Sequence, residues 1–142
     1  DVAHQLLEGS IQVRREGVGG LAVLGNGGLL RQALLNLVDN AIKYAPGGGT
    51  IEILTAGEGA FARLSVRDHG PGIPARDRDR VFERFYRVDR ARSRDSGGTG
   101  LGLAIVKHIA LIHSGSVRLE SSEGSGSTFS ILLPLAPGDG AS

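Results

Sequence analysis

Three polar side chains in one stretch of the sequence have the types and the spacing to hold a metal ion and phosphate. Asn36, Asn40 and Lys43 stand at i, i+4 and i+7, so a helix would place them on one narrow stripe. An Asn carbonyl oxygen is a suitable Mg²⁺ ligand, and Mg²⁺ keeps waters and phosphate oxygens besides. The Lys43 ammonium would neutralise phosphate charge, and Tyr44 could stack against a base. Spacing alone favours the alternative, an ordinary solvated helix face.

A single aspartate, Asp68, stands at the end of a predicted strand. It shares strand parity with Leu64 and Val66, so its side chain should point inward with theirs. A buried carboxylate is costly unless a donor meets it, and an amino group on a planar ligand would be a suitable donor. Gly70 and Gly72 follow, where backbone can approach a ligand closely. A turn-initiating Asp explains these residues equally well.

A glycine-rich segment, Gly-Gly-Thr-Gly-Leu-Gly at 97–102, leads directly into a predicted helix. Glycines let backbone N–H groups gather round an anion, and a helix N-terminus adds positive potential. The segment therefore has the chemistry of a phosphate cradle, although a flexible joint between loop and helix is the alternative. The P-loop motif is absent. Leu103 and the lack of a strand directly before the segment exclude the dinucleotide-binding fingerprint.

Hydrophobic periodicity predicts the elements that would position these residues. Apolar residues recur at helical spacing over 29–44 and 101–113, and strand patterns form two pairs, 51–55 with 62–68 and 117–121 with 128–133. Weaker patterns predict helices at 1–8 and 80–85 and strands at 11–15 and 21–24. This mixed order of helices and hairpins predicts an α+β sandwich, with the helices on one face of a sheet.

The segment 70–99 shows no clear period and is bracketed by glycines. Between Ala75 and Asp95 it carries eight arginines and five acidic residues. An ordered domain rarely keeps a loop of this length without a functional reason, so we expect a mobile loop with a role in the site. Because the arginines are interleaved with acids, the loop does not favour nucleic-acid binding.

Length and composition narrow the class of protein. The chain has 142 residues and a net charge of +1, which fits one domain and gives no support to nucleic-acid binding. Its lack of cysteine excludes disulfides, thiolate metal sites and cysteine nucleophiles. The four histidines have no metal-ligand spacing. The apolar run 101–112 is too short to span a bilayer, so we expect a soluble piece of a longer protein.

Five motifs follow one another along the chain. They are Leu-Leu-Asn-Leu-Val-Asp-Asn-Ala-Ile-Lys-Tyr (34–44), Asp-His-Gly-Pro-Gly-Ile (68–73), Val-Phe-Glu-Arg-Phe-Tyr-Arg (81–87), Gly-Gly-Thr-Gly-Leu-Gly-Leu-Ala-Ile-Val (97–106) and Gly-Ser-Thr-Phe (126–129). Together they resemble the N, G1, F, G2 and G3 boxes of the catalytic ATP-binding domain of bacterial sensor histidine kinases, in the GHKL superfamily. The resemblance covers about 1–134 and leaves 135–142 as a flexible tail. Because five motifs occur in this order, we now favour a functional role over a purely structural one for the first three sites.

The resemblance implies a fold and one half of a nucleotide site. The fold would be the Bergerat sandwich shared with type II topoisomerases and heat-shock chaperones, a mixed sheet packed on three helices, with an ATP lid at about 70–99. In the N box, Asn40 would bind Mg²⁺ and Asn36 is the polar residue one turn earlier. Lys43 would contact phosphate, and Tyr44 would lie beside adenine.

The other motifs imply the second half of that site. Asp68 would accept a hydrogen bond from the adenine amino group, in a pocket shaped by Gly70, Gly72 and Ile73. Phe82 and Phe85 would anchor the lid, and Arg87 could reach phosphate. The residues on the phosphate side would be Gly98, Thr99, Gly100, Leu101 and Gly102, and Thr128 would lie near the adenine end.

The resemblance also implies an enzyme activity and its partners. The domain would bind Mg-ATP and donate the γ-phosphoryl group to a histidine on a separate dimerisation domain of the same parent, in two-component signalling with a response regulator. The acceptor histidine would lie elsewhere, since the chain has no His-Glu/Asp-Leu-Arg-x-Pro motif. Alone, the domain would be a monomer with little turnover. The parent would be a homodimeric membrane sensor with this domain in the cytoplasm.

Two other functions stay open. An ATPase of the topoisomerase or chaperone type would need a water-activating glutamate where Asn36 stands, and the F box favours the kinase. An anti-sigma serine kinase is disfavoured for the same reason. A domain that senses nucleotide without transferring phosphate is compatible with all five motifs.

Overall fold

The computed structural model describes residues 23–44, 49–84, 86, 101–121 and 124–136, together with the backbone of 11–17. Within these residues, a sheet of five strands has the order β1-β2-β3-β5-β4. The strands are β1 (Ile11–Gly17), β2 (Gly49–Glu58), β3 (Phe61–Asp68), β4 (Ser116–Ser121) and β5 (Ser127–Pro134). β1 runs parallel to β2 and the other pairs are antiparallel, so the sheet is mixed, as predicted.

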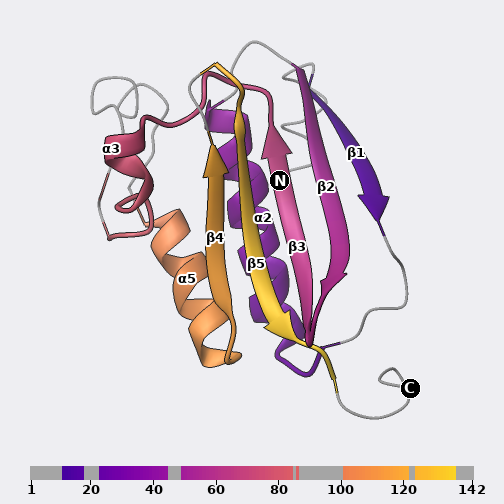
Figure 1. The fold of residues 1–142 in the computed structure, drawn as a ribbon. Coiled ribbons are helices and arrows are strands. Elements are labelled where there is room, and N and C mark those ends of the chain that lie inside the picture. The colour runs from indigo at the N-terminus through magenta and orange to yellow at the C-terminus, as the bar shows by residue number, and fades with distance from the viewer. Residues whose placement is uncertain are drawn as a thin grey trace.

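Two long helices, α2 (Gly27–Tyr44) and α5 (Gly102–Ile112), cover one face of this sheet (Figure 1). They pack against each other, α2 also against β2 and β3, and α5 against β4 and β5. Their buried residues recur at helical spacing: Ala33, Leu37, Val38 and Ala41 on α2, and Leu103, Val106, Ile109 and Ala110 on α5. The predicted α+β sandwich is confirmed. The helix expected at 1–8 lies outside the described residues.

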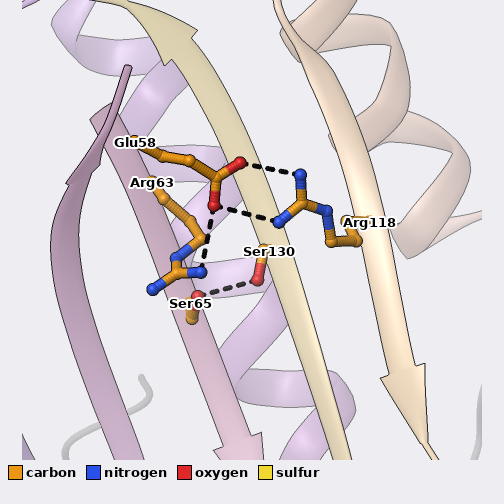
Figure 2. A network of polar contacts seen from close by, with 5 residues as sticks. All are labelled: Glu58, Arg63, Ser65, Arg118 and Ser130. Carbon is orange, nitrogen blue, oxygen red and sulfur yellow. Dashed lines mark hydrogen bonds and ion pairs between the residues drawn. The ribbon is translucent and has the colours of Figure 1, made fainter. Parts of the chain in front are cut away.

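The outer face of the sheet, opposite the helices, carries a network of polar contacts (Figure 2). Glu58 accepts hydrogen bonds from Arg63 at 3.1 Å and from Arg118 at 3.1 and 2.8 Å. The hydrogen bond from Arg118 lowers the pKa of Glu58. Beside this group, the buried hydroxyls of Ser65 and Ser130 bond to each other across 2.7 Å. Side chains of the sheet itself therefore satisfy the polar groups of this face.

The end of α5 fixes the beginning of α2. Asn26 caps α2, because its Oδ1 accepts the Leu29 N–H at 3.0 Å. The Asn26 N–H donates to Nε2 of His113 at 3.0 Å. Since Nε2 accepts, Nδ1 of His113 carries the proton and donates to the Ile109 carbonyl at 2.7 Å. The contact is close: a Cβ on Gly25 would lie 2.4 Å from the His113 ring.

The short helix predicted at 80–85 is wrong. The structure has α3 at Ala75–Arg78, followed by turns. Pro74 explains the earlier start, because its φ of −57° suits a helix N-terminus and its carbonyl accepts the Asp77 N–H at 2.9 Å. Hydrophobic periodicity could not predict this helix start, because it depends on the φ angle that the Pro74 ring fixes.

The strand predicted at 21–24 is also wrong where the structure describes it. Val23 forms a single bridge with Leu135, and Leu24 belongs to no strand. The Leu135 N–H donates to the Ala60 carbonyl at 2.9 Å, so pairing continues one residue beyond the boundary expected at 134. Residues 137–142 lie outside the described part.

No helix in the described part is both long and apolar enough to cross a membrane.

Phe129 should be the most costly core residue of β5 to truncate. It is 1% exposed, and Phe129→Ala would leave a cavity that the packed core cannot fill. We expect the free energy of unfolding, measured by urea denaturation, to fall by about 3–5 kcal/mol. Phe61→Ala is the matched control, because Phe61 is 36% exposed and should cost clearly less. Equal losses for the two variants would contradict this core.

Candidate functional site

One end of the sandwich collects residues that the sequence singled out (Figure 1). β3 and β4 end there, β5 begins there, and the last turn of α2 lies at the same end. Asp68 is the last residue of β3 and is the register partner of Ser127, the first residue of β5. The sheet therefore brings the end of one motif, 68–73, against the beginning of another, 126–129.

The carboxyl group of Asp68 is buried and half paired. Its residue is 1% exposed, as strand parity predicted. Oδ1 accepts the Gly70 N–H at 2.9 Å, whereas Oδ2 has no hydrogen-bond partner among the residues that the structure describes. Burial raises the pKa of this carboxyl, and the backbone N–H groups of Gly70 and Ser127 oppose that rise. Oδ2 is therefore an acceptor suited to an amino donor from a ligand.

Backbone packs closely around this carboxyl group. A Cβ on Gly126 would lie 2.2 Å from the Asp68 carbonyl oxygen, and Gly126 has a φ of +81°. Gly72 is also left-handed, with a φ of 80°. The Gly124 N–H donates to the Pro71 carbonyl at 2.7 Å. The loop after Asp68 thus lies directly on the turn of the β4–β5 hairpin.

Two serines to which the sequence analysis gave no role belong to this cluster: Ser121, outside the five motifs, and Ser127, within the motif 126–129. The Ser121 hydroxyl accepts the Ile73 N–H at 2.8 Å and donates to the Gly126 carbonyl at 2.9 Å. Ser127 Oγ lies 2.9 Å from Ser121 Oγ. Ile73 itself is buried, with 1% of its surface exposed. Strand parity weakly indicates that Ser127 points inward, but serines are common in strands. No local sequence pattern indicates a role for Ser121.

Thr128 lies at the expected end of the sheet, next to Ser127, but on the opposite face from Asp68. It pairs with Arg67, and because successive strand residues alternate, its side chain shares the outer face with Ser130. Ser127 is buried on the inner face as the register partner of Asp68. The register between β3 and β5 sets this parity. The hydroxyl next to Asp68 is therefore that of Ser127.

The two asparagines of α2 differ in how they are paired. Nδ2 of Asn40 is buried and has no hydrogen-bond partner within the described part of the chain. Asn36 is engaged at both ends, since Oδ1 accepts from Gln32 at 2.8 Å and Nδ2 donates to the Gly102 carbonyl at 3.3 Å. Nδ2 of Asn40 is thus available to a ligand, whereas Asn36 joins α2 to the start of α5 through a hydrogen bond. The described residues contain no cluster of three His, Cys, Asp or Glu side chains that could hold a metal.

The other expected site residues divide into described and undescribed ones. Lys43 pairs with Asp39 at 3.0 Å in a partly exposed ion pair, which a phosphate group could replace at little cost. The Leu101 carbonyl accepts the Ile105 N–H at 2.9 Å at the start of α5, and the space around Gly102 is open. Outside the described residues lie the Tyr44 side chain, Phe85, Arg87, Gly98, Thr99 and Gly100.

The segment that follows α3 is anchored to the core. The Phe82 ring meets Phe129 edge to face, with centroids 6.0 Å apart. Tyr86 donates to the buried Asp77 carboxylate, which raises the pKa of Tyr86. The Arg80 guanidinium lies 4.6 Å from the centre of the Tyr86 ring. Phe82 therefore joins this segment to the same residue that fills the centre of β5.

Several curated proteins similar to this chain are sensor histidine kinases. Residues 25–137 match the family described as histidine kinase-, DNA gyrase B-, and HSP90-like ATPase. The sensor-like histidine kinase SenX3 of Mycolicibacterium smegmatis is 51% identical over 127 residues, which are 89% of this chain and 33% of SenX3. The sensor histidine kinase WalK of Bacillus subtilis is 48% identical over 107 residues, 74% of this chain and 18% of WalK.

Solved structures give the same result. The mycobacterial sensor histidine kinase MprB superposes with a TM-score of 0.80 at 34% identity, covering 96% of this chain and 94% of that one. Full-length ShkA in complex with AMPPNP has a TM-score of 0.79 at 31% identity, covering 96% of this chain and 29% of ShkA. The chain spans about a third of the length of its SenX3 relatives.

Asp68→Asn should not destabilise the protein at neutral pH. Because burial raises the pKa of Asp68, its ionised form opposes folding; this penalty is absent below the ordinary Asp pKa and complete above the raised one. We expect Asp68→Asn to have an equal or higher free energy of unfolding than wild type at pH 7, with the difference falling as the pH is lowered through the acid range. Urea denaturation across this range measures it.

Asp79→Asn is the control for this experiment, because it removes the same charge from an exposed position. It should change stability little at any pH. A loss of about 2 kcal/mol or more for Asp68→Asn at pH 7 would instead mean that both carboxylate oxygens are satisfied within the chain.

Proposed function

Since this chain belongs to the histidine kinase-, DNA gyrase B- and HSP90-like ATPase family, as a catalytic domain of the sensor histidine kinase type, we propose where and how it binds Mg-ATP. The adenine would lie at Asp68 and the metal-bound phosphates at Asn40. The γ-phosphoryl group would pass to a histidine on a separate dimerisation domain of the parent. The observation that carries this proposal is the buried Asp68 carboxylate, one oxygen of which has no partner in the part of the chain that the structure describes.

Asp68 would identify the base. Oδ2, which has no partner among the described residues, can accept a hydrogen bond from the exocyclic amino group of adenine. A carbonyl at the same ring position would instead place an acceptor against a carboxylate. The site should therefore distinguish an aminopurine from an oxopurine. Gly70 and Gly72 let the backbone lie close to the ring, and Ile73 adds an apolar side chain.

The residues present fit a magnesium ion bound together with phosphate. Among the described residues, Nδ2 of Asn40 is a buried donor without a partner, which could donate to a phosphate oxygen, and the carbonyl oxygen of the same amide has the chemistry of a Mg²⁺ ligand. The ion would neutralise charge on the phosphates and so favour transfer. Lys43 would exchange its pairing with Asp39 for a phosphate oxygen. The chain itself contributes positioning and charge neutralisation, which is what phosphoryl transfer requires of a protein.

The state of Asn36 favours a kinase over an ATPase of the chaperone or topoisomerase type. Such an ATPase would need a carboxylate at this position to activate water. Asn36 is a neutral amide with both ends occupied, by Gln32 and by the Gly102 carbonyl. An amide so held cannot take a proton from water. We therefore propose that phosphate leaves this site for a histidine acceptor rather than for water.

We also propose which domains the rest of the parent protein contains. Because the chain spans about a third of SenX3 and less of WalK, the acceptor histidine, the dimerisation domain and the sensing domain would lie in the remainder. The parent would be a homodimeric sensor that signals to a response regulator, with this domain in the cytoplasm. The isolated domain would be a monomer.

Asn40→Ala should remove magnesium-dependent binding of ATP. We expect the affinity in the presence of Mg²⁺, measured by titration calorimetry, to fall by about tenfold or more, with little change in EDTA. Arg31→Ala, an exposed change on the same helix, is the control and should bind as wild type does. An unchanged affinity for Mg-ATP in Asn40→Ala would contradict the metal assignment.

Transfer is tested by mixing the domain with γ-labelled ATP and a fragment of the parent that carries the histidine motif. We expect acid-labile phosphate on the fragment, because phosphohistidine hydrolyses in acid. Nucleotide binding without transfer, with a fragment that the full-length parent does phosphorylate, would support the nucleotide-sensing alternative. Steady phosphate release without the fragment would support the ATPase.

A further inference from the structure

Ser121 joins two segments of the nucleotide site that are far apart in sequence, and we propose that it is a positioning residue for base recognition. Its hydroxyl would hold the Ile73 backbone in place relative to Asp68. The inference rests on the proposed adenine site and adds to it a residue that never touches the nucleotide. Ser121 belongs to β4, outside all five motifs.

All the hydrogen-bonding capacity of the Ser121 hydroxyl is used. It accepts the Ile73 N–H at 2.8 Å and lies 2.9 Å from the Gly126 carbonyl, which can only accept. The single Ser121 proton therefore goes to Gly126. It follows that Ser127, at 2.9 Å, donates its own proton to Ser121. One hydroxyl thus makes one donated and two accepted bonds.

These bonds fix the loop after Asp68 from both sides. Ile73 is held at its N–H by Ser121 and at its carbonyl by Nε of Arg78, at 3.1 Å. A second tie, from the Gly124 N–H to the Pro71 carbonyl at 2.7 Å, lies two residues earlier in the loop. The loop that begins at Asp68 is therefore fastened to the β4–β5 hairpin at Pro71 and at Ile73.

The hairpin is also what orients the carboxylate. Gly126 lies against the Asp68 carbonyl, and the Ser127 N–H acts on the Asp68 carboxyl group. Ser121 touches both Gly126 and Ser127. Removing its hydroxyl would loosen both the Ile73 backbone and the turn that supports Asp68. The preference of the site for adenine over an oxopurine would therefore fall.

The test compares binding of ATP and inosine triphosphate, which carries a carbonyl in place of the amino group. Titration calorimetry gives the ratio of the two affinities for wild type, Ser121→Ala and Ser121→Thr. Ser125→Ala is the matched control, because Ser125 is an exposed serine of the same hairpin. Thermal unfolding of each variant reports stability separately.

We expect Ser121→Ala to reduce the preference for ATP over inosine triphosphate by about three- to tenfold, the effect of one to two lost hydrogen bonds. Ser121→Thr keeps the hydroxyl and should restore the preference, and Ser125→Ala should leave it unchanged. A lower melting temperature with an unchanged affinity ratio would overturn the proposal, since Ser121 would then serve stability alone.

Two further readouts separate the possible failures. Hydrogen exchange of the Ile73 amide in the wild-type protein needs no variant, and the amide should be protected; exchange as fast as in an exposed loop would overturn the role of Ser121. A wild type that binds both nucleotides equally would contradict the adenine site at Asp68, and the role of Ser121 in it would fall as well.

Discussion

Asp68 is the last residue of β3, and burial raises the pKa of its carboxyl group. Among the described residues, Oδ1 accepts a hydrogen bond from Gly70 and Oδ2 has no partner. The surrounding elements hold this unfavourable arrangement in place. The Gly126 turn fits against the Asp68 backbone, and the loop to Ile73 is fastened to the same hairpin. An amino donor from a ligand would satisfy the second oxygen, so binding would remove a penalty that folding leaves in place.

The two halves of the proposed site belong to one packed unit. Asp68 comes from the sheet and Asn40 from α2, and α2 packs against β3. α2 is fixed at its beginning by His113 and further along by the bond from Asn36 to Gly102. The adenine base and the phosphates of ATP would therefore contact side chains whose relative positions are fixed by core packing. Phosphoryl transfer requires such positioning.

Local patterns were enough to predict the sandwich and the inward direction of Asp68, because helical and strand periodicity report directly which side is buried. They could not place α3, whose start depends on the ring of Pro74. They also did not place Ser127 beside Asp68, because that neighbour depends on the register between β3 and β5. The tie from Ser121 to Ile73 spans 48 residues, and such tertiary hydrogen bonds leave no local pattern in a sequence.

The central claim, that Asp68 reads the amino group of adenine, is tested most directly by exchanging its acceptor for a donor. Asp68→Asn keeps the size of the side chain but offers an amide N–H₂ where Oδ2 stood. Affinities for ATP and inosine triphosphate are then measured by titration calorimetry. The account predicts that wild type prefers ATP by about tenfold or more and that Asp68→Asn loses or reverses this preference. An Asp68→Asn variant that keeps the full preference for ATP would contradict it.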